Sequence, residues 1–182
     1  MTAETNKPAA IPIFPPGLAR AIKGLPLAPL SLSLTAYARW VAAKHQSMFR
    51  RLGAFGDASF ALDPTDLPFV ITLAPRGGDP KVTVSRKPGA VDARIAGPMA
   101  ALLGLVNGAY DGDALFFSRD LVIEGDTSAA LALRNAVDDA ELDLAGEIAA
   151  FSGPLAGPLK RLIALVERRT GVKLSRPEEP TW

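Results

Sequence analysis

The stretch DALFFSRDLVIEGDT, Asp113–Thr127, decides the fold that we expect for this chain. Its apolar run Leu121–Ile123 includes two β-branched residues, so it predicts a short buried strand. Gly125 interrupts that strand, and the next residue, Asp126, is of a type that favours the N-cap of a helix. The apolar spacing after it predicts that this helix extends to about Asp139. The stretch is therefore predicted to be a buried strand that leads directly into a capped helix.

The composition limits the class of protein. The 182 residues suffice for one domain with terminal extensions. Hydrophobic residues make up 48% of the chain and the mean hydropathy is +0.19. The longest nearly apolar run, Met99–Val106, is nevertheless about half of the ~18 residues that cross a bilayer. The net charge of +1 gives no reason to expect a nucleic acid partner. Because cysteine is absent, disulfides, thiolate metal sites and cysteine nucleophiles are excluded.

Upstream of the opening stretch, residues 53–97 alternate between apolar and polar positions, which is the period of a strand. Short turn clusters separate the apolar runs, and such short connections favour antiparallel neighbours. One cluster, Arg76–Gly78, has the glycines of a phosphate loop but is followed by neither Lys-Ser/Thr nor a helix. It therefore predicts a hairpin turn. The predicted strands are Ser59–Leu62, Phe69–Ala74, Lys81–Ser85 and Val91–Ala96.

Helices on either side of these strands carry apolar faces. A helix predicted at residues 33–52 has an apolar face that also holds His45, the only histidine. We interpret His45 as a structural residue, because the sequence brings no nucleophile or acid to it. A second helix is predicted to begin with Pro98 at its first position and to end at Gly108. The apolar face of the first helix consists of Leu34, Tyr37, Val41, Met48 and Leu52.

The chain offers few groups for catalysis. A serine–histidine–acid triad would have to use His45, and the nucleophile motif GxSxG is absent. No GxGxxG follows a predicted strand, and a zinc ion would find one histidine and no cysteine. The two aspartates in the loop Tyr110–Asp113 are too few for a calcium loop. We therefore expect no enzyme activity, no cofactor and no metal site.

The opening stretch and the helix after it resemble the sterol carrier protein type 2 (SCP2) lipid-binding family. Within this family, the motif is most similar to bacterial accessory factors of oxygen-independent ubiquinone biosynthesis. The resemblance extends over roughly residues 25–145 and fades toward both termini. The residues that carry it are Leu115, Phe116, Phe117, Arg119, Leu121–Thr127, Leu131, Leu133, Asn135 and Asp138.

The resemblance implies an α+β fold, with a five-stranded, mainly antiparallel sheet and helices over one face that enclose an apolar lipid tunnel. Helical extensions are expected at both ends. The chain then divides into a flexible N-terminal arm with a short helix (residues 1–30), the lipid-binding domain (31–145), and a C-terminal amphipathic helix and tail (146–182). Bulky apolar residues are predicted to line the tunnel: Leu102, Leu103, Val106, Leu115, Phe116, Phe117, Leu131 and Leu133.

The resemblance also implies a function. It predicts a non-catalytic carrier of isoprenoid quinone precursors or phospholipids that acts with enzymes of ubiquinone biosynthesis. Burial favours an apolar chain by about 25 cal/mol per Å², so no strong polar anchor is needed. Two other classes remain open. One is a scaffold that recruits biosynthetic enzymes without carrying lipid, and the other is an acyltransferase-associated domain.

A carrier of long-tailed lipid has to reach the membrane, and both terminal regions combine apolar with basic residues. Residues 1–13 lack an apolar period and are predicted to be disordered. The segment Phe14–Leu30 is either a strap packed on the domain or an arm that contacts the membrane. The helix predicted at Leu155–Arg169 either packs on the domain or a second subunit, or binds anionic lipid. Without a secretory signal at residues 1–16, we expect a cytoplasmic protein that is peripheral at the inner membrane. The predicted membrane-contact residues are Phe14, Leu18, Lys160, Arg161, Arg168 and Arg169.

Overall fold

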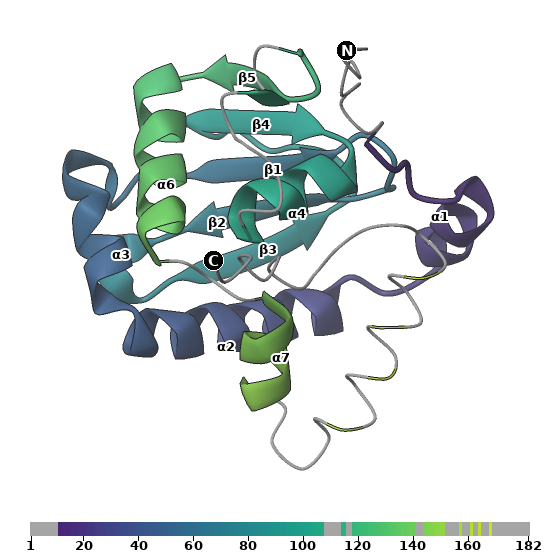
Figure 1. Cartoon of the computed structure of the whole chain (residues 1–182), viewed down its shortest axis with the longest axis horizontal. Coiled ribbons are helices and arrows are strands. Elements are labelled where there is room, and N and C mark those ends of the chain that lie inside the picture. The colour runs from purple at the N-terminus through teal and green to yellow at the C-terminus, as the bar shows by residue number, and fades with distance from the viewer. Residues whose placement is uncertain are drawn as a thin grey trace, which may run out of the picture.

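A five-stranded sheet forms the centre of the molecule (Figure 1). The computed structural model describes residues 11–107, 114–115, 118–140 and 144–151, together with Gly157, Arg161, Ala164 and Arg168. The strands are β1 (Phe60–Pro64), β2 (Val70–Ala74), β3 (Lys81–Ser85), β4 (Ala93–Gly97) and β5 (Val122–Gly125). Their order is β3-β2-β1-β4-β5, and neighbours are antiparallel except β1 and β4, which run parallel. The predicted five-stranded, mainly antiparallel sheet is confirmed.

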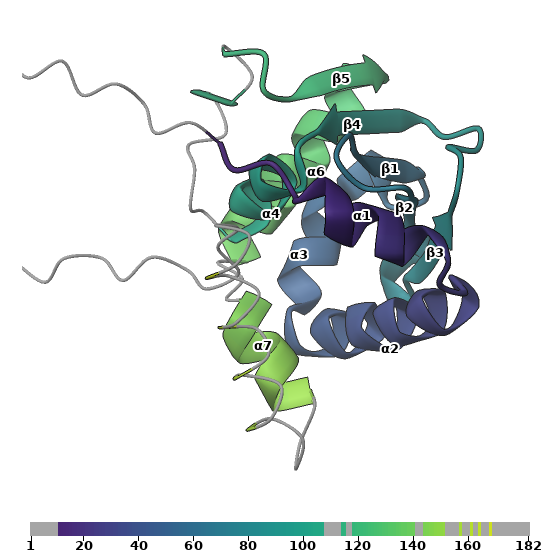
Figure 2. The same ribbon diagram turned by 90° about the vertical axis from the view of Figure 1, so that its right-hand side faces the viewer.

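The helices gather on one side of this sheet. They are α1 (Pro16–Lys23), α2 (Ala28–Lys44), α3 (Gln46–Arg51), α4 (Met99–Asn107), α6 (Thr127–Ala140) and α7 (Leu144–Phe151). Single turns of 3₁₀ helix lie at Gly53–Phe55 and Arg76–Gly78. Figure 2 shows α3, α4 and α6 on the same side of the sheet, with α2 running below them. The molecule is therefore an α+β fold with helices over one sheet face.

The strand register places apolar side chains on the face that the helices cover. Leu62 on β1 pairs with Ile71 on β2 and with Ile95 on β4, and side chains of paired residues point to the same face. Intervening residues belong to the opposite face, where the Arg94 guanidinium donates to the Asp63 carboxylate. This hydrogen bond raises the pKa of Arg94 above its already high ordinary value. The sheet is thus apolar toward the helices and polar on its other face.

Helix α2 covers the free edge of β3. The Oγ of Ser31 accepts a hydrogen bond from the Val84 N–H at 2.8 Å. The Oγ1 of Thr35 accepts from the Val82 N–H at 3.0 Å and donates to the Val82 carbonyl at 2.8 Å. Free N–H groups on an edge strand are a template for pairing with another chain, so these hydroxyls close that edge. They also hold α2 at the margin of the sheet, where it forms a side wall.

The predicted strand-to-helix junction is present. Gly125 ends β5 with a φ of 84°, and a Cβ there would lie 2.3 Å from the Asp92 carbonyl oxygen. Only glycine fits this close approach. The Oδ1 of Asp126 accepts hydrogen bonds from the N–H groups of Ser128 at 2.8 Å and Ala129 at 3.1 Å. These bonds confirm the predicted N-cap and begin α6 directly over the sheet.

The prediction of one long helix at residues 33–52 is wrong, because two helices, α2 and α3, occupy this segment. His45 has φ −115° and ψ 59°, which are not helical angles, and it separates α2 from α3. The first helix also begins earlier than predicted, at Ala28. Pro29 lies in its first turn, where the N–H that proline lacks has no partner inside the helix. The apolar spacing continues across the break, so the periodicity alone did not reveal it.

β5 is an edge strand rather than the buried strand that the sequence predicts. Leu121, just before it, is buried, but Val122 is 49% exposed and Ile123 is the residue that packs against the core. β5 has one neighbour in the sheet, β4, so its outer side remains open among the described residues.

The short turns favoured antiparallel neighbours, so they did not predict that β1 and β4 pair in parallel. The short link after β3 leads to β4, which lies on the far side of β1 and β2.

The N-terminal arm is attached to the domain at Asp66. One carboxylate oxygen accepts a hydrogen bond from the Phe14 N–H at 2.8 Å, and the other accepts from the Met99 N–H at 2.9 Å. Asp66 therefore holds the arm and the start of α4 together. Ile11 packs against the core, so the prediction of disorder is wrong for this part of the arm. Residues 1–10 lie outside the described residues.

Candidate functional site

An apolar cavity of about 250 Å³ lies between the sheet and the helices. Strands β1 to β4 form its floor, and α2, α3, α4 and α6 form its walls. The floor is apolar because alternate residues of each strand face the helices. Its floor residues are Leu62, Ile71, Leu73, Val82 and Ile95. The helical residues include Leu34, Tyr37, Val41, Met48 and Leu52, which is the whole apolar face identified in residues 33–52.

Several residues predicted to line a tunnel lie in this wall. Leu102, Leu103 and Val106 contribute from α4, and Leu133 contributes from α6. Leu131 was placed wrongly, because it is 51% exposed on the outer side of α6. It precedes Leu133 by two residues, and an α-helix turns through about 200° over that distance. The family-like spacing of these two leucines therefore does not put both on one face.

The remaining predicted lining residues lie elsewhere or outside the described residues. Leu115 is 4% exposed, but it packs in the core cluster with Leu121 and is not part of the cavity lining. Phe116 and Phe117 lie outside the described residues. The sheet residues of the floor and Phe49 on α3 were not predicted as site residues. Strand alternation already indicated which sheet residues face the helices, but not that a space remains above them.

Two polar side chains interrupt the apolar lining, Tyr37 on α2 and Arg134 on α6. The apolar spacing of α6 predicts that Arg134 points outward, and this is wrong, because its side chain is 16% exposed. Its Nε lies 3.4 Å from the Asp138 carboxylate, one helical turn further on. A long arginine stem can cover apolar surface while its charged end reaches a partner, which explains how the residue fits this wall.

Helix α7 packs on α2 through aromatic rings beside the cavity. The Phe151 ring on α7 lies edge-on to Tyr37, with 5.9 Å between centroids, and to Trp40 at 6.0 Å. Tyr37 and Trp40 also stack on each other at 6.3 Å. Such offset and edge-on pairs are favourable beyond their buried area. Because Tyr37 also lines the cavity, α7 lies against the outside of the cavity wall.

A buried carboxylate strengthens the contact between α7 and α2. Glu147 on α7 is 6% exposed, and its Oε1 lies 2.7 Å from Lys44 Nζ and 3.0 Å from His45 Nε2. Burial raises the pKa of Glu147, but hydrogen bonds from Lys44 and His45 outweigh it and hold that pKa below its ordinary value of 4.5. His45 therefore ends α2 and binds α7, in agreement with its interpretation as a structural residue.

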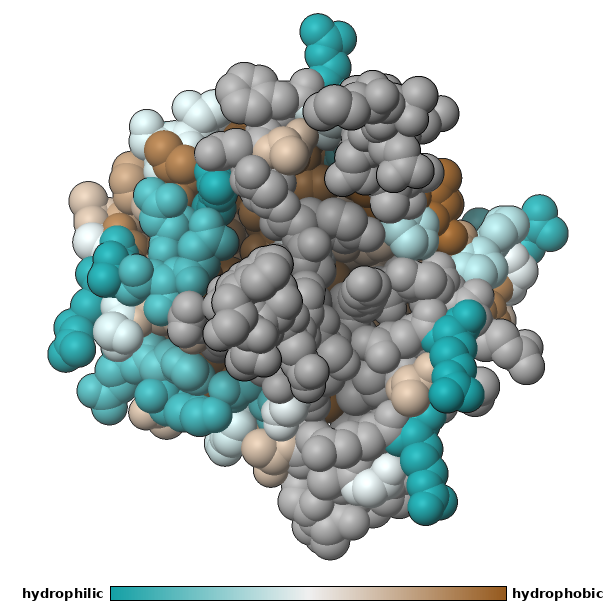
Figure 3. Space-filling view, in the orientation of Figure 1, coloured by the Kyte–Doolittle hydropathy of each residue, from teal (hydrophilic) through white to brown (hydrophobic). Residues whose placement is uncertain are grey.

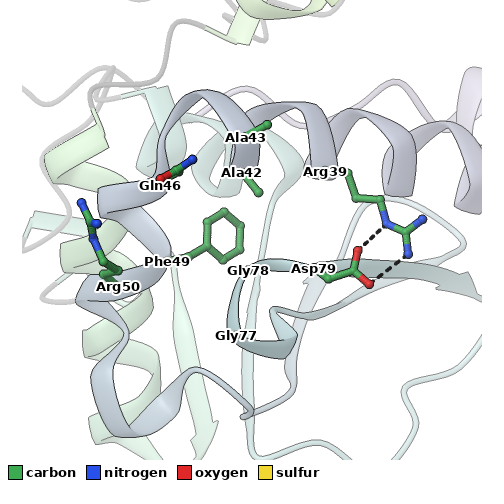
Figure 4. A pocket seen from close by; sticks show the side chains of 9 residues that line it. All are labelled: Arg39, Ala42, Ala43, Gln46, Phe49, Arg50, Gly77, Gly78 and Asp79. Carbon is green, nitrogen blue, oxygen red and sulfur yellow. Dashed lines mark hydrogen bonds and ion pairs between the residues drawn. The ribbon is translucent and has the colours of Figure 1, made fainter.

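A second hollow, the polar cleft, has a volume of about 470 Å³ and lies between α2, α3 and the turn Arg76–Gly78. Figure 4 shows the Phe49 ring between α2 and this turn, with the Arg39–Asp79 ion pair at one end. The Nε of Arg39 lies 2.8 Å from Asp79 Oδ1. Phe49 lines the apolar cavity as well, so one side chain borders both hollows. The cleft is lined by Arg39, Ala42, Ala43, Gln46, Phe49, Arg50, Gly77, Gly78 and Asp79.

Exposed apolar side chains gather on the N-terminal arm and the beginning of α2. No residue of α1 is buried, and Arg20 and Lys23 lie in its last turn. In Figure 3, hydrophilic side chains predominate on the left-hand side, and a hydrophobic patch on the right-hand side, toward α1, lies next to hydrophilic side chains. The predicted contact residue Leu18 is 47% exposed, whereas Phe14 is partly buried. We call the exposed set the N-terminal apolar surface: Ile13, Leu18, Leu25, Leu30 and Leu32.

The predicted C-terminal contact residues are only partly described. Arg161 and Arg168 are helical and exposed. Lys160 and Arg169 lie outside the described residues. Contact of these residues with a membrane stays a prediction.

The candidate site is an apolar space whose lining holds few polar side chains. Within the part of the chain that the structure describes, no cluster of histidine and acidic side chains could hold a metal ion. No helix in that part combines the length and the apolar character needed to span a bilayer. A sheet floor with helices around an apolar space is the arrangement of proteins that enclose apolar ligands.

A family comparison agrees with this class of protein. Residues 41–138, more than half of the chain, match the model of the SCP-2 sterol transfer family. The protein therefore belongs to the SCP-2 sterol transfer family. No curated protein sequence matches the chain. The matched residues run from the last turn of α2 to the last turn of α6, so they include most of the cavity lining.

Solved structures are similar to this chain in fold. A UbiJ-SCP2 ubiquinone synthesis protein is 16% identical with a TM-score of 0.51, covering 64% of this chain and 96% of that one. The apo form of sterol carrier protein 2 from Yarrowia lipolytica is 18% identical with a TM-score of 0.44, covering 62% and 92%. The sec-alkylsulfatase Pisa1 from Pseudomonas sp. is 15% identical with a TM-score of 0.43, covering 48% and 14%. At 16% identity and a TM-score of 0.51, the UbiJ-SCP2 structure shows that the two chains share a fold.

Proposed function

We propose that this protein is a non-catalytic lipid carrier and that an apolar chain of its ligand occupies the cavity. The observation that carries this proposal is the cavity of about 250 Å³, which strands β1 to β4 and four helices line with apolar residues. Burial of apolar surface is favourable by about 25 cal/mol per Å², so even a few hundred Å² holds a ligand firmly before ordering costs. Membership in the SCP-2 sterol transfer family supports the same function.

The volume limits how much of a ligand the cavity holds. Pockets that enclose drug-sized ligands measure about 300–1,000 Å³, which is larger than this cavity. A cavity of this size accommodates a segment of an acyl or prenyl chain rather than a long polyprenyl tail. A longer tail therefore requires the helices to separate from the sheet, or it leaves part of its length outside.

The ligand class that we propose is an isoprenoid quinone precursor, with phospholipid as the alternative ligand. The protein then acts as an accessory factor in oxygen-independent ubiquinone biosynthesis and presents its ligand to the modifying enzymes. Two observations support this role. The motif around Leu121–Thr127 resembles the accessory factor UbiT, and the fold is similar to that of a ubiquinone synthesis protein.

We place the exchange of lipid at a membrane surface. The N-terminal apolar surface lies beside Arg20 and Lys23 of α1, and apolar side chains next to basic ones suit the interface of a bilayer with anionic head groups. Arg161 and Arg168 add exposed basic charge near the C-terminus. Asp66 holds the arm on the domain through Phe14, so the strap and the membrane-contact interpretations are compatible.

Lipid mass spectrometry of the purified full chain tests the carrier function. We expect prenylated or acylated lipid to be extracted from the wild type and to be absent from Leu103→Trp, whose larger side chain fills the cavity. Leu131→Trp introduces the same ring on the exposed side of α6 and serves as the matched control, with occupancy unchanged. A folded wild type without lipid, or equal loss in both variants, would contradict the carrier and favour the scaffold that recruits enzymes through the N-terminal apolar surface.

A further inference from the structure

We propose that the polar cleft binds the head group of the ligand and that this head group is anionic, a carboxylate or a phosphate. This inference rests on the proposed function, because it needs a ligand chain in the apolar cavity. It adds a second site and the chemical class that this site accepts. The ligand then lies across α3, with its chain on one side of Phe49 and its head on the other.

The position of Phe49 joins the two hollows. Its side chain belongs to the lining of the apolar cavity and to that of the polar cleft. In Figure 4 the ring lies across the cleft below Ala42 and points toward the side of Gly77 and Gly78. Phe49 sits on α3, a helix of 6 residues that follows the break at His45. A rotation of one ring, or a small shift of this short helix, therefore connects the apolar space to the cleft.

The cleft has room beside the ring because its neighbours are small. Ala42 faces it from α2, and glycine occupies two positions of the opposite turn. Gly77 and Gly78 have φ angles of 61° and 113°, which side chains rarely tolerate, and a Cβ at either would meet nothing within 4 Å. The turn conformation thus requires glycine at the positions where a side chain would project into open space.

The donors of the cleft are side chains. The N–H groups of Gly77 and Gly78 already bond to carbonyl oxygens of Gly56 and Pro75, so they do not form an anion-binding loop. Gln46 and the exposed Arg50 line the cleft from α3, and the Arg50 side chain has no ion-pair partner among the described residues. A guanidinium binds carboxylate or phosphate through two parallel hydrogen bonds.

Charge in the cleft favours an anion that stays close to water. Arg39 and Arg50 outnumber Asp79, the one acid of the lining. The Arg39–Asp79 pair is exposed, at 54% and 68% for the two side chains, and exposed pairs contribute little, so an incoming anion can replace Asp79 on Arg39. An ionised head group inside the apolar cavity would lose its hydration, and the charged side chain of that lining, Arg134, already pairs with Asp138, so the cleft suits an anion better.

Binding of three short probes to the full chain tests this assignment. Decanoate, decyl phosphate and decanol share one alkyl chain and differ in the head group, and isothermal titration calorimetry measures each affinity. We expect both anions to bind wild type more tightly than decanol. Arg50→Gln should weaken the anions about tenfold and leave decanol unchanged, because it removes a charge-assisted hydrogen bond. Lys87→Gln removes an equal charge from an exposed position outside the cleft and should change none of the affinities.

The outcomes separate this inference from the carrier function. If decanoate and decanol bind equally to wild type, the chain site stands and the anionic head-group site is wrong. A further outcome is that the preference for anions survives in Arg50→Gln and in the charge-neutral double variant Arg39→Gln/Asp79→Asn but disappears in Arg134→Gln. In that case the head group binds in the cavity wall, and the assignment to the polar cleft is wrong. If none of the three probes binds, the proposed function itself fails.

Discussion

The cavity and the N-terminal apolar surface are built from the same kinds of residue and use them in opposite ways. Around the cavity, leucine, valine and isoleucine from α2, α4 and four strands face one another across an apolar space. In the N-terminal apolar surface, Leu18 on α1 and Leu32 on α2 are 47% and 73% exposed, and α1 buries none of its residues. The two regions differ in what packs against them. The sheet and the helices pack around the cavity residues, whereas no described part of the chain buries the residues of α1.

Both regions depart from what stability alone would favour. A cavity leaves its lining without dispersion contacts on one side, and exposed apolar side chains forgo burial. Proteins keep such departures mainly where function requires them. We therefore interpret the cavity as the place where a ligand chain replaces the missing contacts, and the N-terminal apolar surface as the place where a membrane does. The following predictions test whether the two regions differ in this way.

The largest expected effect contrasts one leucine from each region. Leu52, at 3% exposed, packs in the core cluster and lines the cavity, so Leu52→Ala should lower the free energy of unfolding by about 2–5 kcal/mol. Leu18→Ala, on α1, should change it by less than about 0.5 kcal/mol. Urea denaturation of both variants measures this. Similar losses in the two variants would show that α1 packs on the domain in solution.

The ion contact between α7 and α2 should respond to pH. Because the folded-state pKa of Glu147 lies below its ordinary value, the contact stabilises fully above pH 4.5 and is lost as the pH falls through that lower folded-state value. Glu147→Gln should cost about 1.5–3 kcal/mol near neutral pH and flatten this dependence. Fluorescence of Trp40, which contacts Phe151, reports the docking of α7 in a Trp182→Phe background.

The exposed acid Asp57 provides the control for that experiment. Asp57→Asn changes the charge by the same amount without touching α7, so the acid transition seen by Trp40 should remain as in the wild type. An unchanged transition in Glu147→Gln as well would mean that the carboxylate does not hold α7 on α2.

Binding to vesicles tests the N-terminal apolar surface. We expect weak, reversible sedimentation with anionic vesicles that decreases with salt, because basic residues near such a surface contribute about 1 kcal/mol each. Arg20→Gln/Lys23→Gln should reduce binding several-fold, and changing Lys160, Arg161, Arg168 and Arg169 to Gln should reduce it further. Lys81→Gln/Lys87→Gln, with the same charge change on and after β3, is the control. Equal binding to neutral and anionic vesicles would leave the basic residues without this role.

The smallest effect concerns the cap of α6. Asp126→Ala removes two hydrogen bonds to N–H groups at the start of that helix and should cost about 1 kcal/mol, seen as a lower Tm. Lipid occupancy of the folded protein should be nearly unchanged, because Asp126 is not part of the cavity lining. Asp126→Asn retains a capping oxygen and should restore most of the stability. A loss of lipid with intact stability would assign Asp126 a role in binding.

Local features of the structure follow from local sequence. The strand β3 has the bounds that alternation predicts, and the others lie within two residues of them. Asp126 caps α6 as its position before an apolar period indicates, since a cap and the N–H groups it binds are two or three residues apart. The residues predicted to form one apolar face in 33–52 do share a face, even though His45 divides the helix, and that face lines the cavity. Each of these features depends on neighbours within one or two turns of chain.

By itself, the sequence determined the class of fold, the strand-to-helix junction and which helical faces are apolar. The tertiary structure alone decided that β4 pairs in parallel with β1, that Arg134 lies in the cavity wall while Leu131 faces outward, and that Phe49 borders two hollows. It also brought Glu147 to Lys44 across 103 positions of sequence. The physical reason is that periodicity specifies a face of an element but not the distance between elements. A cavity is a property of that distance, set by how whole helices rest on the sheet.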